Sequence, residues 1–238
     1  MNNKARIGAI ALAAAAMTGC ASTNNNPRDP LEGFNRAMFS FNDTVDTYAL
    51  KPAAQAYDTV VPNPVQTGVG NFFGNIGDLW SSVNQLLQGR VEQGVSTFMR
   101  VAINTTFGLG GVLDVATEAR LPREKSDFGQ TLGKWGVGSG PYVVLPFFGP
   151  STVRDTAGLP VDLYGDLWTY KRPVRWRNVG SVIRVVDRRA QLLDASTLLE
   201  DAALDKYDFV RDAYLQRRQS QITGGSAGRE QKEEAVKP

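Results

Sequence analysis

A stretch of apolar residues between positions 65 and 87 most constrains how this chain can fold. These residues recur at spacings of three and four, the repeat of one face of an α-helix. They are Val65, Val69, Phe72, Phe73, Ile76, Leu79, Trp80, Val83, Leu86 and Leu87. Asparagine, aspartate and glutamine interrupt the stretch, so it cannot cross a bilayer as a free helix. Three placements stay open: a core helix, a helix in a membrane interface with its aromatic side chains in lipid, or part of a protein-lined ring.

Similar apolar spacing predicts further helices at 29–48, 91–107, 179–193 and 195–221. Asp29, Pro30 and Glu32 predict the start of the first, as N-cap, first-turn proline and capping-box partner. The chain carries 24 glycines and 12 prolines, a load that favours short, broken helices over a long bundle. We therefore predict an all-α fold of amphipathic helices in one domain spanning residues 29–222. Glycines 70, 74 and 77 lie along one side of their helix, where small residues let helix backbones approach closely.

Residues 136–150 interrupt the helical pattern with alternating glycines followed by an apolar, proline-containing run. This composition excludes a regular helix, and Pro146 argues against a central strand. The glycines do not match a dinucleotide-binding loop, because Val143 stands at the third glycine position. Nor does Ser139 lie in a nucleophile elbow, because Val137 stands where a glycine is needed. We predict an ordered, apolar, non-helical segment that could move as a gating hairpin.

Two glycine clusters flank this region, and glycine adopts many backbone conformations at little cost. The candidate hinge residues are Gly108, Gly110, Gly111, Gly136, Gly138 and Gly140.

Residues 167–177 interleave aromatic and basic side chains, a pattern typical of a membrane interface that faces anionic headgroups. The same cluster could instead bind an acidic partner or form a solvated surface. Together with the aromatic positions of the 65–87 stretch, it defines the candidate membrane-facing residues. They are Phe72, Phe73, Ile76, Leu79, Trp80, Trp168 and Trp176.

The first 19 residues have the pattern of a secretory signal: Lys4 and Arg6, then an apolar run, then small residues. The signal ends at Cys20, which resembles a bacterial lipobox, although an ordinary secreted protein with a stray cysteine is the alternative. The resemblance implies cleavage before Cys20 and covalent lipid on it, with several acyl chains giving stable anchoring. Residues 20–28 then form a flexible tether, and residues 223–238 a disordered tail. Neither Ala21 nor Ser22 is the aspartate that retains lipoproteins in the inner membrane, which implies the outer membrane.

The composition excludes several classes of function. A single cysteine permits no intramolecular disulfide, and the absence of histidine removes Ser-His and Cys-His catalysis and the commonest zinc ligand. Without the signal, 24 basic residues balance 24 acidic ones, so nucleic acid is not an expected partner. We expect no metal, and no cofactor besides the lipid on Cys20.

Five stretches spread over the mature chain resemble the MlaA (VacJ) lipoprotein family. They are DPLEGFNRAMFSFN (29–42), NFFGNI (71–76), RVAINTTFGLGGVLDVA (100–116), FGQTLGKWGVGSGPYVVLPFFGPSTVRD (128–155) and RAQLLD (189–194). The resemblance implies a ring of helices in the inner leaflet of the outer membrane, facing the periplasm, with a central amphipathic channel. It also implies removal of mislocalised phospholipid from the outer leaflet, without covalent chemistry. The implied partners are a trimeric porin, a periplasmic lipid carrier and, indirectly, an inner-membrane ABC transporter.

Two other functions stay as alternatives. A lipid-modifying enzyme is disfavoured because the chain lacks histidine and a G-x-S-x-G motif. A structural lipoprotein that tethers the envelope would be expected to carry a long coiled coil or a peptidoglycan-binding motif, and neither pattern is present in the sequence.

Overall fold

The computed structural model describes residue 26 and residues 29–223, and these are predominantly helical. The predicted signal, Cys20 and the tail beyond Thr223 lie outside the described residues. The helices are α2 (Glu32–Val45), the π-helical turn η1 (Asp46–Leu50), α3 (Lys51–Val60), α4 (Asn63–Leu87), α5 (Val91–Thr106), α6 (Val115–Glu118), α7 (Phe128–Lys134), α8 (Val153–Gly165), the 3-10 turn η2 (Leu167–Tyr170), α9 (Val174–Ala190), α10 (Leu193–Ala202) and α11 (Lys206–Thr223). The strands are β1 (Tyr142–Leu145) and β2 (Gly149–Thr152).

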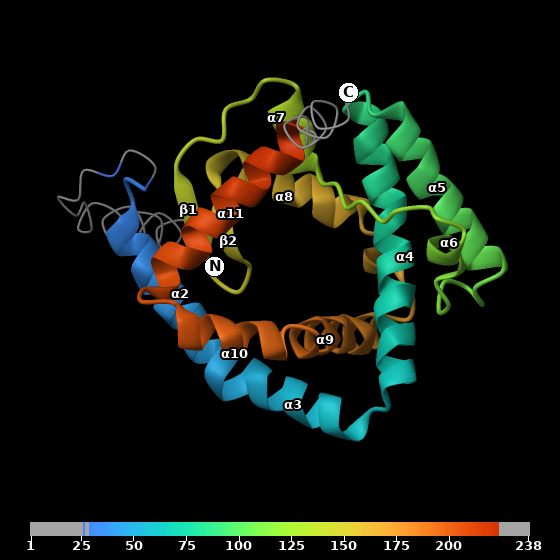
Figure 1. Ribbon diagram of the computed structural model, residues 1–238, viewed down its shortest axis with the longest axis horizontal. Coiled ribbons are helices and arrows are strands. Elements are labelled where there is room, and N and C mark those ends of the chain that lie inside the picture. Colours follow the sequence, from blue (N-terminus) through green and yellow to red (C-terminus); the bar gives the residue numbers. More distant parts are fainter. Residues whose placement is uncertain (1–25, 27–28, 224–238) are drawn as a thin grey trace, which may run out of the picture.

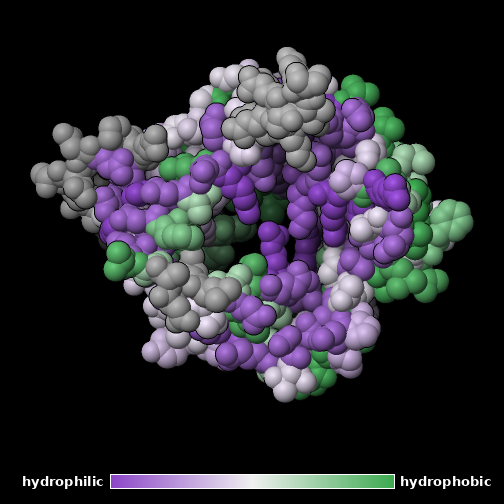
Figure 2. All heavy atoms as spheres, in the orientation of Figure 1, coloured by the Kyte–Doolittle hydropathy of each residue, from purple (hydrophilic) through white to green (hydrophobic). Residues whose placement is uncertain are grey.

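These elements form a closed circuit (Figure 1). In order, α2, η1, α3, α9, α4, α7, α11, β2 and β1 each pack against the next, and β1 packs against α2 again. Helix α5 lies outside the circuit along α4, and α6 packs on α5. Figure 2 shows that the centre is hollowed and bordered largely by hydrophilic residues. Within the described residues, no helix combines the length and the apolar character needed to cross a membrane.

The antiparallel pair β1–β2 forms a small sheet within the predominantly helical fold that the sequence predicts. Tyr142 pairs with Thr152 and Leu145 with Gly149, and the turn between the strands contains Pro146 and Phe147. Proline cannot donate to a strand ladder, but here it lies just beyond the paired residues. The segment is therefore non-helical and ordered, as the glycines and prolines predict, and Pro146 does not prevent strands on either side of it.

The buried residues of the described chain are mainly polar. The largest side chains with almost no solvent exposure include Arg100, Gln85, Asn35, Asn84, Thr97, Thr131, Asp29 and Asp78. By contrast, apolar residues of α4 and α5 are exposed, and Figure 2 shows a hydrophobic periphery where α5 lies. These exposed residues include Val83, Leu86, Leu87, Val91, Val95, Phe98 and Met99. A water-soluble domain buries its apolar stripe, so this distribution is inverted on α4 and α5.

The start of the first helix differs from the prediction. The N-cap of α2 is Leu31, without a side-chain cap hydrogen bond, and Asp29 is fully buried instead. One Asp29 oxygen accepts a hydrogen bond from Asn35 Nδ2 at 2.8 Å, and the other accepts from the Tyr207 hydroxyl and Arg211. Asp29 therefore joins the beginning of α2 to α11, a contact between residues far apart in the sequence.

Glycines allow two helix backbones to approach closely, but not at Gly70, Gly74 and Gly77, where the sequence predicted it. Gly70 faces the Gln191 amide and Gly74 faces the Arg123 guanidinium, so both accommodate side chains instead of a helix backbone, and Gly77 has open space. Helix backbones meet at Gly129 of α7 and Gly158 of α8, where a Cβ on Gly158 would lie 2.9 Å from the Gly129 nitrogen. The packing of α7 on α8 thus requires the absence of a side chain.

We predict that Gly158→Ala destabilises the fold by about 1–3 kcal/mol, because the added methyl must displace backbone atoms. The matched control is Gly77→Ala, whose methyl meets nothing within 4 Å and removes the helix cost of glycine, so it should stabilise by about 0.5–1 kcal/mol. Thermal unfolding of both variants in detergent measures the difference. Equal midpoints for the two variants would contradict the close contact.

Candidate functional site

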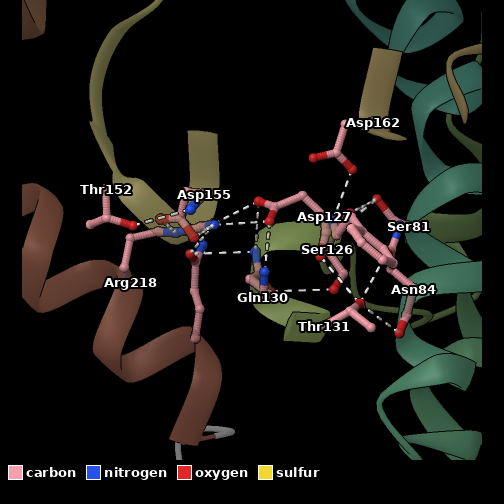
Figure 3. Close-up of polar contacts among 12 residues, drawn as sticks. Ser81, Asn84, Ser126, Asp127, Gln130, Thr131, Thr152, Asp155, Asp162 and Arg218 are labelled. Carbon is pink, nitrogen blue, oxygen red and sulfur yellow. Dashed lines mark hydrogen bonds and ion pairs between the residues drawn. The ribbon is translucent and has the colours of Figure 1, made fainter. Parts of the chain in front are cut away.

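A seam of buried polar side chains joins α7 to α4 (Figure 3). Asp127 caps α7 by accepting from the Gln130 backbone nitrogen at 2.9 Å. Thr131 Oγ1 lies 2.8 Å from Asn84 Oδ1 and accepts from Gln88 Nε2 at 3.0 Å, and Gln88 also donates to Ser126 Oγ at 2.7 Å. These bonds satisfy groups that would be costly to bury alone, so the seam fixes α7 on α4.

The seam continues into an ion-pair cluster that reaches α8 and α11 (Figure 3). Arg218 of α11 donates to Asp127 at 2.6 and 2.9 Å and to Asp155 of α8 at 2.9 Å. Asp155 also accepts from the Tyr214 hydroxyl at 2.7 Å and from Arg154. Desolvation opposes its ionisation, but Arg218, Tyr214 and Arg154 together lower the pKa of Asp155. The cluster positions α7 and α11, two helices of the circuit, against α8 and is structural in character.

A second buried cluster holds the loop that follows α5. Arg100 is fully buried and binds both oxygens of Asp114 at 2.9 Å, and Asn104 donates to the same carboxylate at 3.1 Å. Asp114 also caps α6 by accepting from the Thr117 nitrogen. Desolvation acts against the charge, but the hydrogen bonds from Thr117, Asn104 and Arg100 lower the pKa of Asp114 to about 2.

The structure places the six candidate hinge glycines in two different environments. In the first cluster, a Cβ on Gly108 would lie 2.2 Å from the Leu113 carbonyl, and one on Gly111 would lie 2.6 Å from the Asn75 amide. Gly110 and Gly111 have positive φ, so this segment is a turn in which Gly108 and Gly111 are closely packed and Gly110 has open space. In the second cluster, Gly136 has positive φ with open space, and Gly138 also has open space.

The last glycine of the second cluster, Gly140, has positive φ and lies close to the Val153 side chain. Gly110, Gly136 and Gly138 therefore have open space around them, and the last two lie immediately before the hairpin.

The hairpin itself is held by two asparagines of α2. Asn35 donates to the Tyr142 carbonyl at 3.0 Å and accepts from the Val144 nitrogen at 2.8 Å. Asn42 does the same with the Leu145 carbonyl and the Phe147 nitrogen, at 2.9 and 2.8 Å. Each amide thus imitates one peptide unit of a neighbouring strand and covers the free edge of β1. These contacts could not be predicted from the sequence, because they join residues more than 100 positions apart.

The candidate membrane-facing residues do not share one surface. Phe73 is only 8% exposed and stacks edge-on with Phe72 and Trp168, at centroid distances of 5.3 and 5.1 Å, which places it inside an aromatic cluster. Trp80 is half-buried and donates from Nε1 to Asp162 at 2.7 Å. Ile76, Leu79, Phe72 and Trp168 are also of intermediate exposure. Trp176 is 54% exposed.

Exposed apolar side chains are instead frequent on the C-terminal part of α4, on α5 and on α9. The spacing of apolar residues at 91–107 predicts an amphipathic helix, but spacing alone does not show whether its apolar face points inward or outward. Within the described residues, no group of three or more cysteine, aspartate or glutamate side chains could hold a metal ion.

We predict that the Asp114 cluster makes the fold sensitive to acid. The pKa of Asp114 in the fold lies below its ordinary value of 3.8, so its charge stabilises the fold above pH 3.8 and this contribution is lost as pH falls toward 2. The contribution is at most about 2 kcal/mol. Asp114→Asn should unfold more easily at pH 7, and its difference from the wild type should shrink between pH 4 and pH 2.

Glu92→Gln, which removes an exposed carboxylate of α5, serves as the control and should follow the wild type throughout. Thermal unfolding across this pH range measures both variants. A constant gap between Asp114→Asn and the wild type would contradict the assignment.

Comparison with known proteins gives one consistent result. The profile of the MlaA lipoprotein family matches residues 27–221. The intermembrane phospholipid transport system lipoproteins MlaA of Shigella flexneri and Escherichia coli K12 are 41% and 40% identical over 231 residues, covering 93% of this chain and 90% of theirs. The Haemophilus influenzae protein of the same name is 36% identical, covering 90% of this chain and 89% of its own.

A solved structure, described as the structural basis for maintenance of bacterial outer membrane lipid asymmetry, superposes with a TM-score of 0.70 at 43% identity. The match covers 80% of this chain and 96% of that one. The sequence resemblance, the profile match and the shared fold agree over nearly all of the described residues. This chain belongs to the MlaA lipoprotein family.

Proposed function

We propose that this protein is an outer-membrane lipoprotein that removes mislocalised phospholipid from the outer leaflet and passes it through its central opening toward the periplasm. The observation that carries the proposal is the inverted distribution of side chains. Apolar residues of α4 and α5 face outward, whereas the centre is hollowed and bordered largely by hydrophilic residues (Figure 2). Relatives of 36–41% identity bear names that assign them to intermembrane phospholipid transport.

The two surfaces suit the two halves of a phospholipid. Exposed apolar side chains such as Phe98 and Leu86 are stabilised in the acyl region of a membrane, where water does not have to hydrate them. A polar headgroup in that region loses hydration unless other polar groups replace the water. A hydrophilic opening would supply such groups and lower the barrier to headgroup passage. The described helices are too short or too polar to cross a bilayer, which fits a placement in one leaflet.

The remaining features of the proposal come from the family and from the sequence. Cys20 would carry the lipid anchor, which would hold the ring in the inner leaflet with access to the periplasm. A trimeric porin would surround or border the ring, and a periplasmic carrier would receive the lipid and deliver it to an inner-membrane ABC transporter. The protein would perform no covalent chemistry. A tethering lipoprotein or a lipid-modifying enzyme would not require a hydrophilic opening inside an apolar rim.

We predict that deletion of the gene raises the amount of phospholipid in the outer leaflet, measured by surface labelling of intact cells. Restoring the wild-type chain should return the signal to its original level, and Cys20→Ser should not, because the anchor places the ring in its leaflet. If the labelled phospholipid does not change while the envelope loses integrity, the tethering function is favoured and the proposal is wrong.

We also propose that the hairpin gates the opening through positions 136–138. Gly138→Pro should restrict this backbone, so the variant should fail to restore lipid clearance although it accumulates normally. Gly138→Ala is the matched control, because the site has open space, and it should restore clearance. Full clearance by Gly138→Pro would exclude a hinge at this position.

A further inference from the structure

A continuous exposed segment, residues 170–176, runs from the last residue of η2 to the first turn of α9, and we call it the basic segment. Every residue in it is exposed to solvent. Its side chains combine three positive charges with two large aromatic rings, and the proposed function assigns no role to them. They are Tyr170, Lys171, Arg172, Pro173, Val174, Arg175 and Trp176.

The two ends of the basic segment are held in place by the fold. Trp168, just before it, packs edge-on against Phe73 of α4 at a centroid distance of 5.1 Å. The same ring covers Gly180 of α9 so closely that a Cβ there would lie 2.1 Å from it. Its Nε1 donates to the carbonyl of Arg177, just after the segment, at 3.0 Å. Because both ends are tied to Trp168, the exposed residues between them are presented at a fixed place on the surface.

The fold gives the three cations of the basic segment no carboxylate partner. In the part of the chain that the structure describes, the side chains of Lys171, Arg172 and Arg175 make no hydrogen bond and no ion pair. The guanidinium carbon of Arg175 lies over the Trp176 ring, 5.3 Å from its centroid. Arg175 is also in the first turn of α9, where a positive charge opposes the helix dipole and does not stabilise the helix. The three charges are therefore available to anions outside the protein.

The carboxylates that flank the basic segment along the chain have other partners. No aspartate or glutamate occurs at positions 167–186. Asp166 binds Arg184 of α9 at 2.5 Å, and Asp187 is buried and accepts from the Tyr57 hydroxyl at 3.0 Å. The basic segment thus has a local excess of positive charge, although the formal net charge of the whole chain is only +2.

Apolar side chains continue the exposed surface along α9. Val179, Val182 and Ile183 are exposed, and their spacing of three and four places them on one side of the helix. Trp176 lies three residues before Val179 and so belongs to the same side. A cationic and aromatic end that passes into an aliphatic face matches the layers of a bilayer, where phosphates lie above acyl chains. An acidic surface of a partner protein would match the charges but not the adjoining aliphatic face.

We propose that the basic segment docks onto the headgroup layer of the membrane, where Lys171, Arg172 and Arg175 bind the phosphates of anionic phospholipids. The inference rests on the placement in a leaflet that the proposed function contains, and it adds the class of lipid that this surface contacts. Guanidinium groups bind phosphate oxygens in pairs, and an ammonium group adds a point charge. The rings of Tyr170 and Trp176 suit the boundary between headgroups and acyl chains. The contact sets the depth of the start of α9 in the leaflet.

The test measures which lipids surround the basic segment in the full lipidated chain. Val174→Cys places a thiol between the cations at an exposed position, and an NBD fluorophore attached there leaves the lipidated Cys20 unmodified. The labelled chain is reconstituted into phosphatidylcholine vesicles in which a small fraction of the lipid is nitroxide-labelled phosphatidylglycerol or nitroxide-labelled phosphatidylcholine, which quench the fluorophore on contact. We expect the phosphatidylglycerol to associate roughly fivefold more strongly, the effect of about one cation at an anionic surface, and this preference to fall as salt rises.

Neutralising the three cations should remove the preference. In the labelled chain, the combined variant Lys171→Gln/Arg172→Gln/Arg175→Gln should be quenched equally by the two lipids, and it removes no hydrogen bond or ion pair found in the described residues. Quenching by the labelled phosphatidylcholine should persist in this variant, which checks that the chain is still folded into the membrane.

The matched control is Lys134→Gln/Arg188→Gln/Arg217→Gln, which removes three exposed charges outside the basic segment and should keep the preference. Equal quenching by the two lipids before neutralisation, an unchanged preference afterwards, or the same loss in the control would each overturn the inference. Absence of quenching by either lipid would show that the segment meets water or a partner protein, and would overturn it too. Surface labelling of the complemented deletion strain separates the two proposals. If the wild type restores clearance but shows no headgroup preference, only this inference fails.

Discussion

The structure depends on the requirement that polar groups buried between helices find partners within the protein. Because α4 and α5 turn much of their apolar surface outward, these helices are not held together mainly by burial of hydrophobic side chains. Gln85, Gln88, Thr131 and Arg100 lie buried instead, where an unpaired donor or acceptor costs about 1–3 kcal/mol. Each such side chain makes at least one hydrogen bond to a neighbouring segment, although Gln85 Oε1 and Arg100 Nε make none, and these bonds fix which helices meet and at what position.

The arrangement around the opening follows from these contacts. Arg218 joins α11 to α7 and α8, Asp29 joins the start of α2 to α11, and the asparagines of α2 hold β1. The circuit therefore closes through directional hydrogen bonds and ion pairs, with close backbone contact at Gly129 and Gly158. A framework held in this way can keep an opening at its centre, because its rigidity does not require side chains to fill the middle.

Much of the fold could be predicted from the sequence, because the local signals are strong. The spacing of apolar residues located the long helices, and the glycines and prolines of 136–150 marked the non-helical segment. Spacing did not show which way the stripes face: Val182 and Leu86 satisfy the helical repeat, and both are exposed. Phe73 and Trp176 were both predicted to face a membrane, but Phe73 is buried and Trp176 is exposed.

The other features that could not be predicted from the sequence depend on contacts between segments that are far apart in the chain. Asp29 precedes the first helix, as an N-cap residue would. Its carboxylate instead accepts a hydrogen bond from Tyr207, 178 residues away, and is buried. The sequence does not show that Arg123 and Arg184, which lie in different segments, both contact α4, at Gly74 and Phe73 respectively. The direction of lipid movement is likewise a property of the whole transport system.

The central claim is that the outer face of α4 and α5 contacts lipid while the opening contains water. Single substitutions Phe98→Cys and Lys125→Cys in the full chain, with Cys20 retained for lipidation, test it directly in native membranes. A membrane-impermeant, water-soluble maleimide added to opened cells should label the chain substituted at position 125 and leave the chain substituted at position 98 unlabelled until detergent is added. Labelling at position 98 without detergent, or none at position 125, would contradict the account.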